Sequence, residues 1–235
     1  MAEHRPLQDQ LDTARQESMA GLDMPWLLAQ WATRQPDKTC LIWAPFNGPE
    51  QTWTYQQLFN DATQVATGLH QRGVRAGEFV IIHLDNSPEF VVAWYACAIL
   101  GAVAVSTNTH SVARDLEYFA RHTAAVCAIT QPCFAQLISN ACQDLRFIVV
   151  TDNDAGEPHP NPQQQCLAIN ASAFADLFVT GELPALPTDP QRNLSVQFTS
   201  GTTSRPKAVL WTHANGLWAG KASAMHMRLR RDDIT

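Results

Sequence analysis

Short apolar segments alternate with helical segments through the middle of the chain. Val80-Ile81-Ile82 and residues 147–150 are continuous apolar runs, typical of parallel strands that are buried on both faces. The pattern predicts strands over 79–84, 102–106, 125–130 and 145–151, with helices over 88–100, 112–122 and 133–142. We therefore expect an α/β fold, in which a mostly parallel sheet is flanked by helices on both faces.

Before this alternation, the pattern predicts two helices and a hairpin. Asn47-Gly48 is a turn signal, and Thr54 with Gln57 matches a capping box. We expect a helix over 24–35, paired strands over 39–46 and 51–54, and a helix over 54–73. After residue 151 we expect a surface loop over 152–165, a short strand over 167–170, a short helix over 172–179 and a connector over 181–191.

Composition excludes several classes of protein. The chain has 235 residues, 46% of them hydrophobic, and a formal net charge of −6. Such a chain is globular, and its mild acidity argues against nucleic acid as a partner. The uncharged run over 90–105 is shorter than a bilayer requires and is divided by Gly101, so we expect no membrane span. The six cysteines form no CxxC pair and the N-terminus lacks an apolar signal region, which favours a reducing, cytoplasmic location.

The most informative stretch lies over residues 195–213. An apolar strand ends at Phe198, six small residues follow over 199–204, and Arg205, Pro206 and Lys207 lead into a second apolar strand. Gly allows the backbone to approach a ligand closely, loop N–H and hydroxyl groups can surround phosphate oxygens, and Lys adds a compact positive charge. The spacing matches neither a Walker A loop nor a dinucleotide GxGxxG. From the residues alone, a flexible hydroxyl-rich loop between two strands is the alternative.

The ten residues over 198–207, Phe-Thr-Ser-Gly-Thr-Thr-Ser-Arg-Pro-Lys, resemble the signature phosphate loop of adenylate-forming (AMP-binding) enzymes. Residues 53–58 resemble an early box of that superfamily, and residues 84–102 resemble its "N-x-x-E-F … GA" segment. The run over 83–86 and the Thr-Ser-Arg-Pro-Lys variant over 203–207 are most similar to acyl-CoA synthetases of the carnitine/crotonobetaine–CoA ligase type. The resemblance covers about residues 22–235 and implies the N-terminal portion of the large domain of such an enzyme.

The resemblance also implies the chemistry. In these enzymes the loop holds the ATP phosphates with Mg²⁺, a carboxylate attacks the α-phosphate, and a thiol, usually that of CoA, then takes the acyl group. Carried over by position, the phosphate-binding residues are Thr199, Ser200, Gly201, Thr202, Thr203 and Lys207. Ser204 and Ala208 stand where the superfamily most often has Gly, and Ser106 stands where it usually has Pro. No residue of this chain is assigned as a metal ligand.

The later motifs of the superfamily are absent from the sequence, so we expect the catalytic residues beyond residue 235. The chain is then a truncated N-terminal fragment that we expect to be inactive by itself. Its expected partners are a small carboxylate and the missing C-terminal portion of the same enzyme. We divide it into a leader over 1–20, an α/β subdomain over 21–180, a linker over 181–193 and a truncated strand–phosphate loop–strand–helix unit over 194–235. Two alternatives remain open: an adenylation domain of another branch of the superfamily, and a standalone non-catalytic module that binds nucleotide or a partner.

Overall fold

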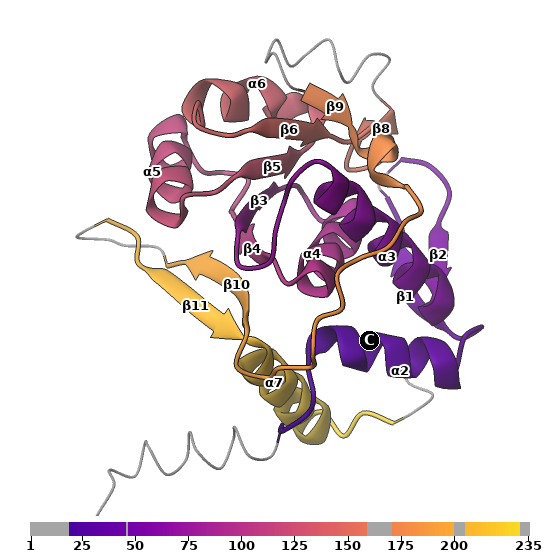
Figure 1. Cartoon of the computed structure of the whole chain (residues 1–235). Coiled ribbons are helices and arrows are strands. Elements are labelled where there is room, and N and C mark those ends of the chain that lie inside the picture. Colours follow the sequence, from indigo (N-terminus) through magenta and orange to yellow (C-terminus); the bar gives the residue numbers. More distant parts are fainter. Residues whose placement is uncertain (1–18, 46, 159–170, 200–204, 231–235) are drawn as a thin grey trace, which may run out of the picture.

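The computed structural model describes residues 19–45, 47–158, 171–199 and 205–230. Its centre is a seven-stranded sheet in the order β11-β10-β4-β3-β5-β6-β9 (Figure 1). Every neighbouring pair in it is parallel except β10 and β11, which are antiparallel. The strands are β3 (Phe79–His83), β4 (Val103–Ser106), β5 (Cys127–Thr130), β6 (Phe147–Val150), β9 (Ala171–Ala173), β10 (Asn193–Phe198) and β11 (Ala208–Thr212).

Helices cover both faces of the sheet, as the alternating pattern predicts. One core contains Val80, Ile82 and Ala104 and is covered by α3 (Tyr55–Gln71) and α4 (Pro88–Leu100). The other contains Ile81, Val103 and Val105 and is covered by α5 (Ala113–Thr123) and α6 (Pro132–Ala141). Alternate residues of one strand thus enter opposite cores. The prediction of a mostly parallel α/β sheet flanked by helices is confirmed.

Helix α4 is apolar around its whole circumference, since it lies between the sheet and α3. Ser87 caps its first turn, and Gly101 ends it in the left-handed region at φ 75°. At 1.5 Å per residue its 13 residues extend for about 20 Å, less than the roughly 30 Å hydrocarbon layer. Among the described residues, no helix combines the length and apolar character needed to cross a bilayer.

The remaining elements lie around this sheet. Helix α2 (Met24–Arg34) packs against α3 and α4, and β1 (Thr39–Trp43) pairs with β2 (Gln51–Thr54) in a separate hairpin. Strand β1 ends before Pro45, earlier than the predicted residue 46, and Phe46 lies outside the described residues. Helix α7 (His213–His226) packs on α2 through Ala214 and Leu217.

The structure differs from the predictions between residues 152 and 179. Within the predicted loop, β7 (Asn153–Asp154) pairs with β8 (Glu157–Pro158), because the Asn153 side chain accepts from the Gly156 N–H at 3.0 Å and closes the turn. The strand predicted over 167–170 lies outside the described residues, and β9 follows directly. The predicted helix over 172–179 is a short 3₁₀ helix, η2 (Phe174–Leu177), anchored by buried Phe174 and Leu177.

The segment over 181–193 connects η2 to β10 and runs past α4 toward α7 (Figure 1). Asp23 Oδ2 accepts a hydrogen bond from the Asp189 N–H at 3.3 Å and lies 3.9 Å from Arg192 Nη1. These two contacts connect the segment to the start of α2. β10 then joins the main sheet beside β4. The regions predicted as the α/β subdomain and the 194–235 unit therefore share one sheet, and the division between them stays a prediction. Most of the predicted leader lies outside the described residues.

Candidate functional site

The β10–β11 hairpin presents the loop that the sequence singles out. Phe198 lies opposite Ala208 in the last register pair. Beyond this pair, the Thr199 N–H donates to the Lys207 carbonyl at 3.0 Å, and the Lys207 N–H donates to Thr199 Oγ1 at 3.3 Å. The first and last residues of the predicted phosphate-binding set are thus held side by side at the base of the loop.

The other four predicted residues, Ser200, Gly201, Thr202 and Thr203, lie outside the described residues. Thr199 and Lys207 are both exposed. Because Thr199 Oγ1 accepts from Lys207, its own hydroxyl hydrogen can still donate to another group. The Lys207 ammonium offers three further donors. The donors at the loop base therefore suit an anion with several oxygen atoms.

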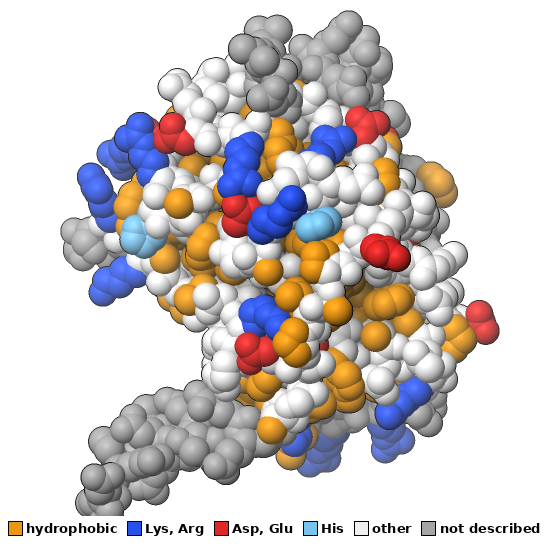
Figure 2. Space-filling view, in the orientation of Figure 1, with side chains coloured by type: hydrophobic (Ala, Val, Ile, Leu, Met, Phe, Trp, Pro, Cys, Tyr) orange, Lys and Arg blue, Asp and Glu red, His pale blue; other side chains and the backbone are white. Residues whose placement is uncertain are grey.

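The surroundings of the loop are basic although the whole chain is acidic. Figure 2 shows Lys and Arg side chains (blue) over the side of the molecule where α5 and the tip of the β10–β11 hairpin lie. On α5 the Arg114 side chain is 90% exposed and the Arg121 side chain 69% exposed, and Arg205 and Lys207 are exposed on the hairpin. Glu117 offsets part of this charge through an ion pair with Arg121 at 3.0 Å. A positive surface of this kind raises the local concentration of anions.

An open pocket of about 500 Å³ lies at the carboxyl edge of the sheet, next to the loop base. Residues after β3, after β4 and at the end of β10 line it: Leu84, Asp85, Asn86, Phe90, Ser106, Thr107, Asn108, Thr109, His110, Gln197 and Phe198. Ligands of open parallel α/β sheets bind outside the carboxyl ends of the strands. The pocket and the loop are therefore at the edge where a ligand is expected.

A hydrogen-bond network fixes the loops around this pocket. Asp85 accepts from the Thr109 hydroxyl at 2.9 Å and from Gln131 Nε2 at 3.0 Å, and its N–H donates to Gln131 Oε1 at 2.8 Å. These bonds join the segments that follow β3, β4 and β5. Sequence reasoning did not single out Thr109 or Gln131. The signal in the sequence was the presence of polar residues within three positions of the end of each apolar strand.

Two buried histidines lie at the ends of strands: His83 ends β3, next to the pocket residue Leu84, and His213 follows β11 and begins α7. His83 Nδ1 is 2.8 Å from Thr107 Oγ1, and the Thr107 hydroxyl also lies 3.3 Å from the Ile82 carbonyl oxygen. His213 Nδ1 instead accepts from the Met24 N–H at 3.2 Å. Burial lowers the pKa of each histidine to about 4, so both rings are neutral near pH 7. Through these contacts, His83 stabilises the end of β3 and His213 connects the start of α7 to the start of α2.

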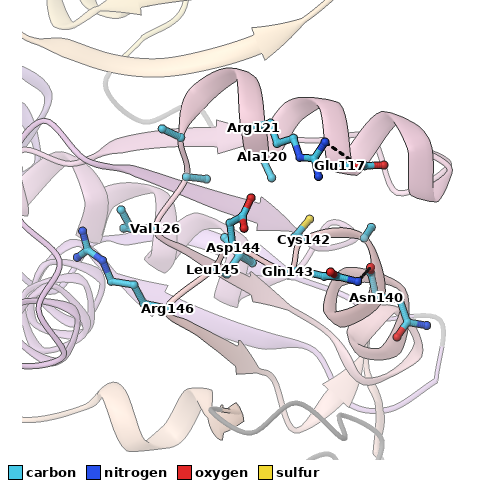
Figure 3. A pocket seen from close by; sticks show the side chains of 13 residues that line it. Glu117, Ala120, Arg121, Val126, Asn140, Cys142, Gln143, Asp144, Leu145 and Arg146 are labelled. Carbon is cyan, nitrogen blue, oxygen red and sulfur yellow. Dashed lines mark hydrogen bonds and ion pairs between the residues drawn. The ribbon is translucent and has the colours of Figure 1, made fainter.

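A second cavity, of about 520 Å³, lies at the opposite edge of the sheet (Figure 3). It is bounded by the end of α5, the end of α6 and the residues just before β5 and β6, among them Val126 and Arg146. Polar side chains, including the ion pair of Glu117 with Arg121, lie around it. It contains none of the predicted site residues, and its position at the amino ends of the strands makes it the weaker candidate.

A mostly parallel sheet with helices on both faces defines an α/β protein of the doubly wound kind. A pocket and a Lys-bearing loop lie at the carboxyl edge of this sheet. The chain belongs to the AMP-binding enzyme family, which matches residues 28–235. The resemblance seen in the sequence is therefore confirmed at the level of the family.

Curated relatives include CoA ligases. The chain is 32% identical over 204 residues to the crotonobetaine/carnitine–CoA ligase of Salmonella paratyphi A, covering 84% of this chain and 38% of that protein. The enzyme of the same name from Shigella flexneri serotype 5b is also 32% identical, over 201 residues. The chain thus spans well under half the length of the curated relatives that it matches.

Solved structures share the fold. The apo structure of MbtA from Mycobacterium smegmatis superimposes with a TM-score of 0.78 at 25% identity and covers 97% of this chain and 41% of that one. The anthranilate CoA ligase AuaEII, in complex with anthranoyl-AMP, gives a TM-score of 0.70 at 26% identity, covering 85% of this chain and 36% of that one.

Proposed function

We propose that this chain provides the ATP phosphate-binding part of an ATP-dependent acyl-CoA ligase. The observation that carries the proposal is the pair of hydrogen bonds between Thr199 and Lys207, which closes the base of a loop at the carboxyl edge of the sheet. Membership of the AMP-binding enzyme family and similarity to CoA ligases support it. Because the chain spans 38% of the length of such a relative, we assign the remaining catalytic groups to a further segment of the protein.

Under this proposal, Thr199, Ser200, Gly201, Thr202, Thr203 and Lys207 bind the β- and γ-phosphates of ATP. The exposed hydroxyl of Thr199 and the ammonium of Lys207 suit phosphate oxygens, as described above. Mg²⁺ is held mainly by phosphates and a few protein oxygens in sites of this kind, so it would enter bound to ATP. Among the residues that the structure describes, no group of three or more His, Cys, Asp or Glu side chains is arranged to hold a metal ion.

The reaction that we propose has two steps. A carboxylate oxygen attacks the α-phosphorus of ATP, and the bond to the β-phosphate oxygen breaks, giving an acyl-adenylate and pyrophosphate. The sulfur of CoA then attacks the acyl carbon and AMP leaves, with the thiol proton passing to solvent. Loop donors and Lys207 act by positioning the phosphates and neutralising their charge. The substrate class is a small carboxylate, and the free thiols of the described cysteines fit the cytoplasm as the proposed location.

The test is carboxylate-dependent exchange of labelled pyrophosphate into ATP, measured on the full-length gene product with a panel of small carboxylates. Lys207→Ala removes the charge at the loop base. We expect kcat/KM for ATP to fall about 10- to 100-fold, the factor that corresponds to a hydrogen bond to a charged group. Lys207→Arg should retain part of the activity because it keeps the charge.

Lys221→Ala is the matched control, because Lys221 is exposed on α7, outside the loop. It should leave exchange unchanged. Exchange that is equal in Lys207→Ala and the wild type would refute the phosphate role of this residue. ATP binding without exchange by any carboxylate would favour a non-catalytic nucleotide-binding module instead.

A further inference from the structure

Helix α5 contacts both ends of the loop between β10 and β11. At the loop entry, the Phe198 ring stacks on the Phe119 ring, with centroids 4.0 Å apart and planes at 22°. Phe119 is buried in the core between α5 and the sheet. The residue just before Thr199 is therefore fixed to a rigid part of the molecule.

At the loop exit, the contacts come from the adjacent residue of α5. The Tyr118 hydroxyl donates to the Pro206 carbonyl at 3.1 Å, although the two residues are 88 positions apart in the sequence. The Arg205 guanidinium lies 5.5 Å from the centroid of the Tyr118 ring, within cation–π distance. The Tyr118 ring also meets Phe198 edge-on, with centroids 6.0 Å apart. Tyr118 thus contacts the entry and the exit together.

The peptide unit between Pro206 and Lys207 is held on both sides. Its carbonyl accepts from Tyr118, and its N–H donates to Thr199 Oγ1 at 3.3 Å. Fixing both polar groups of one peptide fixes the plane of that peptide. Since this peptide directly precedes the Lys207 Cα, it sets the direction in which the Lys207 side chain leaves the loop.

We propose that Tyr118 is a positioning residue that orients the loop exit, and with it Lys207, before a phosphate binds. This inference rests on the proposed function, because that function assigns phosphate binding to the loop. The contact between Tyr118 and Pro206 does not depend on it. A loop held in its binding conformation avoids the entropy cost of ordering at each binding event. Tyr118 acts through Pro206 and Lys207 and is assigned no contact with the reacting atoms.

The experiment compares Tyr118→Phe, Tyr118→Leu and Arg205→Ala in the full-length protein. Tyr118→Phe removes only the hydroxyl, and Tyr118→Leu also removes the ring beneath Arg205. The control is Tyr55→Phe, which removes a hydroxyl from α3 on the other face of the sheet. Trypsin cleavage at Lys207–Ala208, followed by mass spectrometry without nucleotide, reports how often the loop exit opens.

Tyr118→Phe should accelerate this cleavage about 3- to 10-fold, the factor corresponding to one hydrogen bond of ordinary net strength. Tyr118→Leu should accelerate it further, and in both variants cleavage at tryptic sites outside the hairpin should rise less than cleavage at Lys207. In a double-mutant cycle, Arg205→Ala should have less effect once Tyr118 is Leu, because the two side chains share one contact. In pyrophosphate exchange, both Tyr118 variants should raise KM for ATP more than they lower kcat.

Cleavage at Lys207 that is as slow in Tyr118→Phe and Tyr118→Leu as in the wild type would overturn the proposal. So would cleavage that rises equally at tryptic sites throughout the chain, since that result indicates global destabilisation. The proposed function fails on a different observation, namely exchange that is insensitive to Lys207→Ala. Faster cleavage together with that insensitivity would keep Tyr118 as an anchor of the loop exit and remove its role toward phosphate.

Discussion

Gly68 lies where α3 crosses the chain at η2, and the space there admits no side chain. A Cβ atom at this position would lie 2.3 Å from the Leu177 carbonyl oxygen and 2.7 Å from the Leu177 Cα. Leu177 is fully buried, so its backbone is held in place. Close approach of two backbones is one of the few reasons to keep Gly inside a helix. At Gly220 in α7 the packing does not require glycine, because a Cβ atom there would have no neighbour within 4 Å.

At this scale we predict opposite effects for one substitution at two glycines. Gly68→Ala should lower the free energy of unfolding by about 1–3 kcal/mol, because the backbone at Leu177 must move. Gly220→Ala should raise it by about 0.5–1 kcal/mol through helix propensity. Urea denaturation of both variants provides the measurement, and a loss of stability in Gly220→Ala would contradict the account.

The helices differ in how their first turns are capped. At α3, Thr54 Oγ1 accepts from the Gln57 N–H at 3.2 Å and Gln57 Oε1 accepts from the Thr54 N–H at 2.8 Å, a complete capping box. The N-cap of α5 is Val112, which has the extended backbone of a cap, is 57% exposed and makes no side-chain hydrogen bond there. Helix α5 therefore keeps its place through its buried face and its contacts with the hairpin.

Val112→Ser should stabilise the protein by about 0.5–2 kcal/mol, because a hydroxyl at an N-cap accepts from the first turn and little apolar burial is lost. Val112→Ala is the matched control, since it removes the same methyl groups without adding an acceptor. The comparison is made by chemical denaturation. Equal free energies of unfolding in the two variants would show that the missing N-cap hydrogen bond does not limit the stability of α5.

At the scale of the whole molecule, two cores on opposite faces of one sheet hold the fold together, and two histidines are buried at its margins. His83 lies at the carboxyl end of β3, and His213 joins α7 to the start of α2. Burial is the main cause of the lowered pKa in both, and Asp85 beside His83 and Asp23 beside His213 oppose it only in part. The folded protein therefore resists protonation of these rings more than the unfolded chain does.

The pH dependence follows from this difference. The unfolded chain binds protons at these histidines below about pH 6.5, whereas the folded protein does so only near pH 4, so stability should fall as the pH decreases through this window. Each histidine contributes up to about 3 kcal/mol at about 1.4 kcal/mol per pH unit. Denaturation series between pH 7 and 4 should show a smaller slope in His213→Gln, which retains an acceptor for the Met24 N–H.

His226→Gln, at an exposed position on α7, is the control for this series. It should reproduce the wild-type slope. A His213→Gln slope equal to that of the wild type would exclude a contribution of the buried ring to acid sensitivity.

Much of the fold followed from local pattern. The apolar runs of β3 and β6 predicted these strands, because burial on both faces requires consecutive apolar residues. Thr54 and Ser87 predicted the starts of α3 and α4, because the hydrogen bonds of a helix cap form between residues that are close in the sequence. The region between 152 and 179 was predicted less well. Its turn at Asn153 and its 3₁₀ helix depend on one side-chain bond and on contacts with distant elements, and such contacts leave no periodic signal.

The sequence by itself determined the class of fold, the family resemblance and the loop that ends at Lys207, since each is encoded in consecutive residues. Only the tertiary structure decided which side chains support that loop. Tyr118 and Pro206 are 88 residues apart, and Asp85 and Gln131 are 46 apart. These pairs meet because parallel strands bring their carboxyl ends to one edge and because α5 packs beside β10, an arrangement that no single stretch of the chain contains.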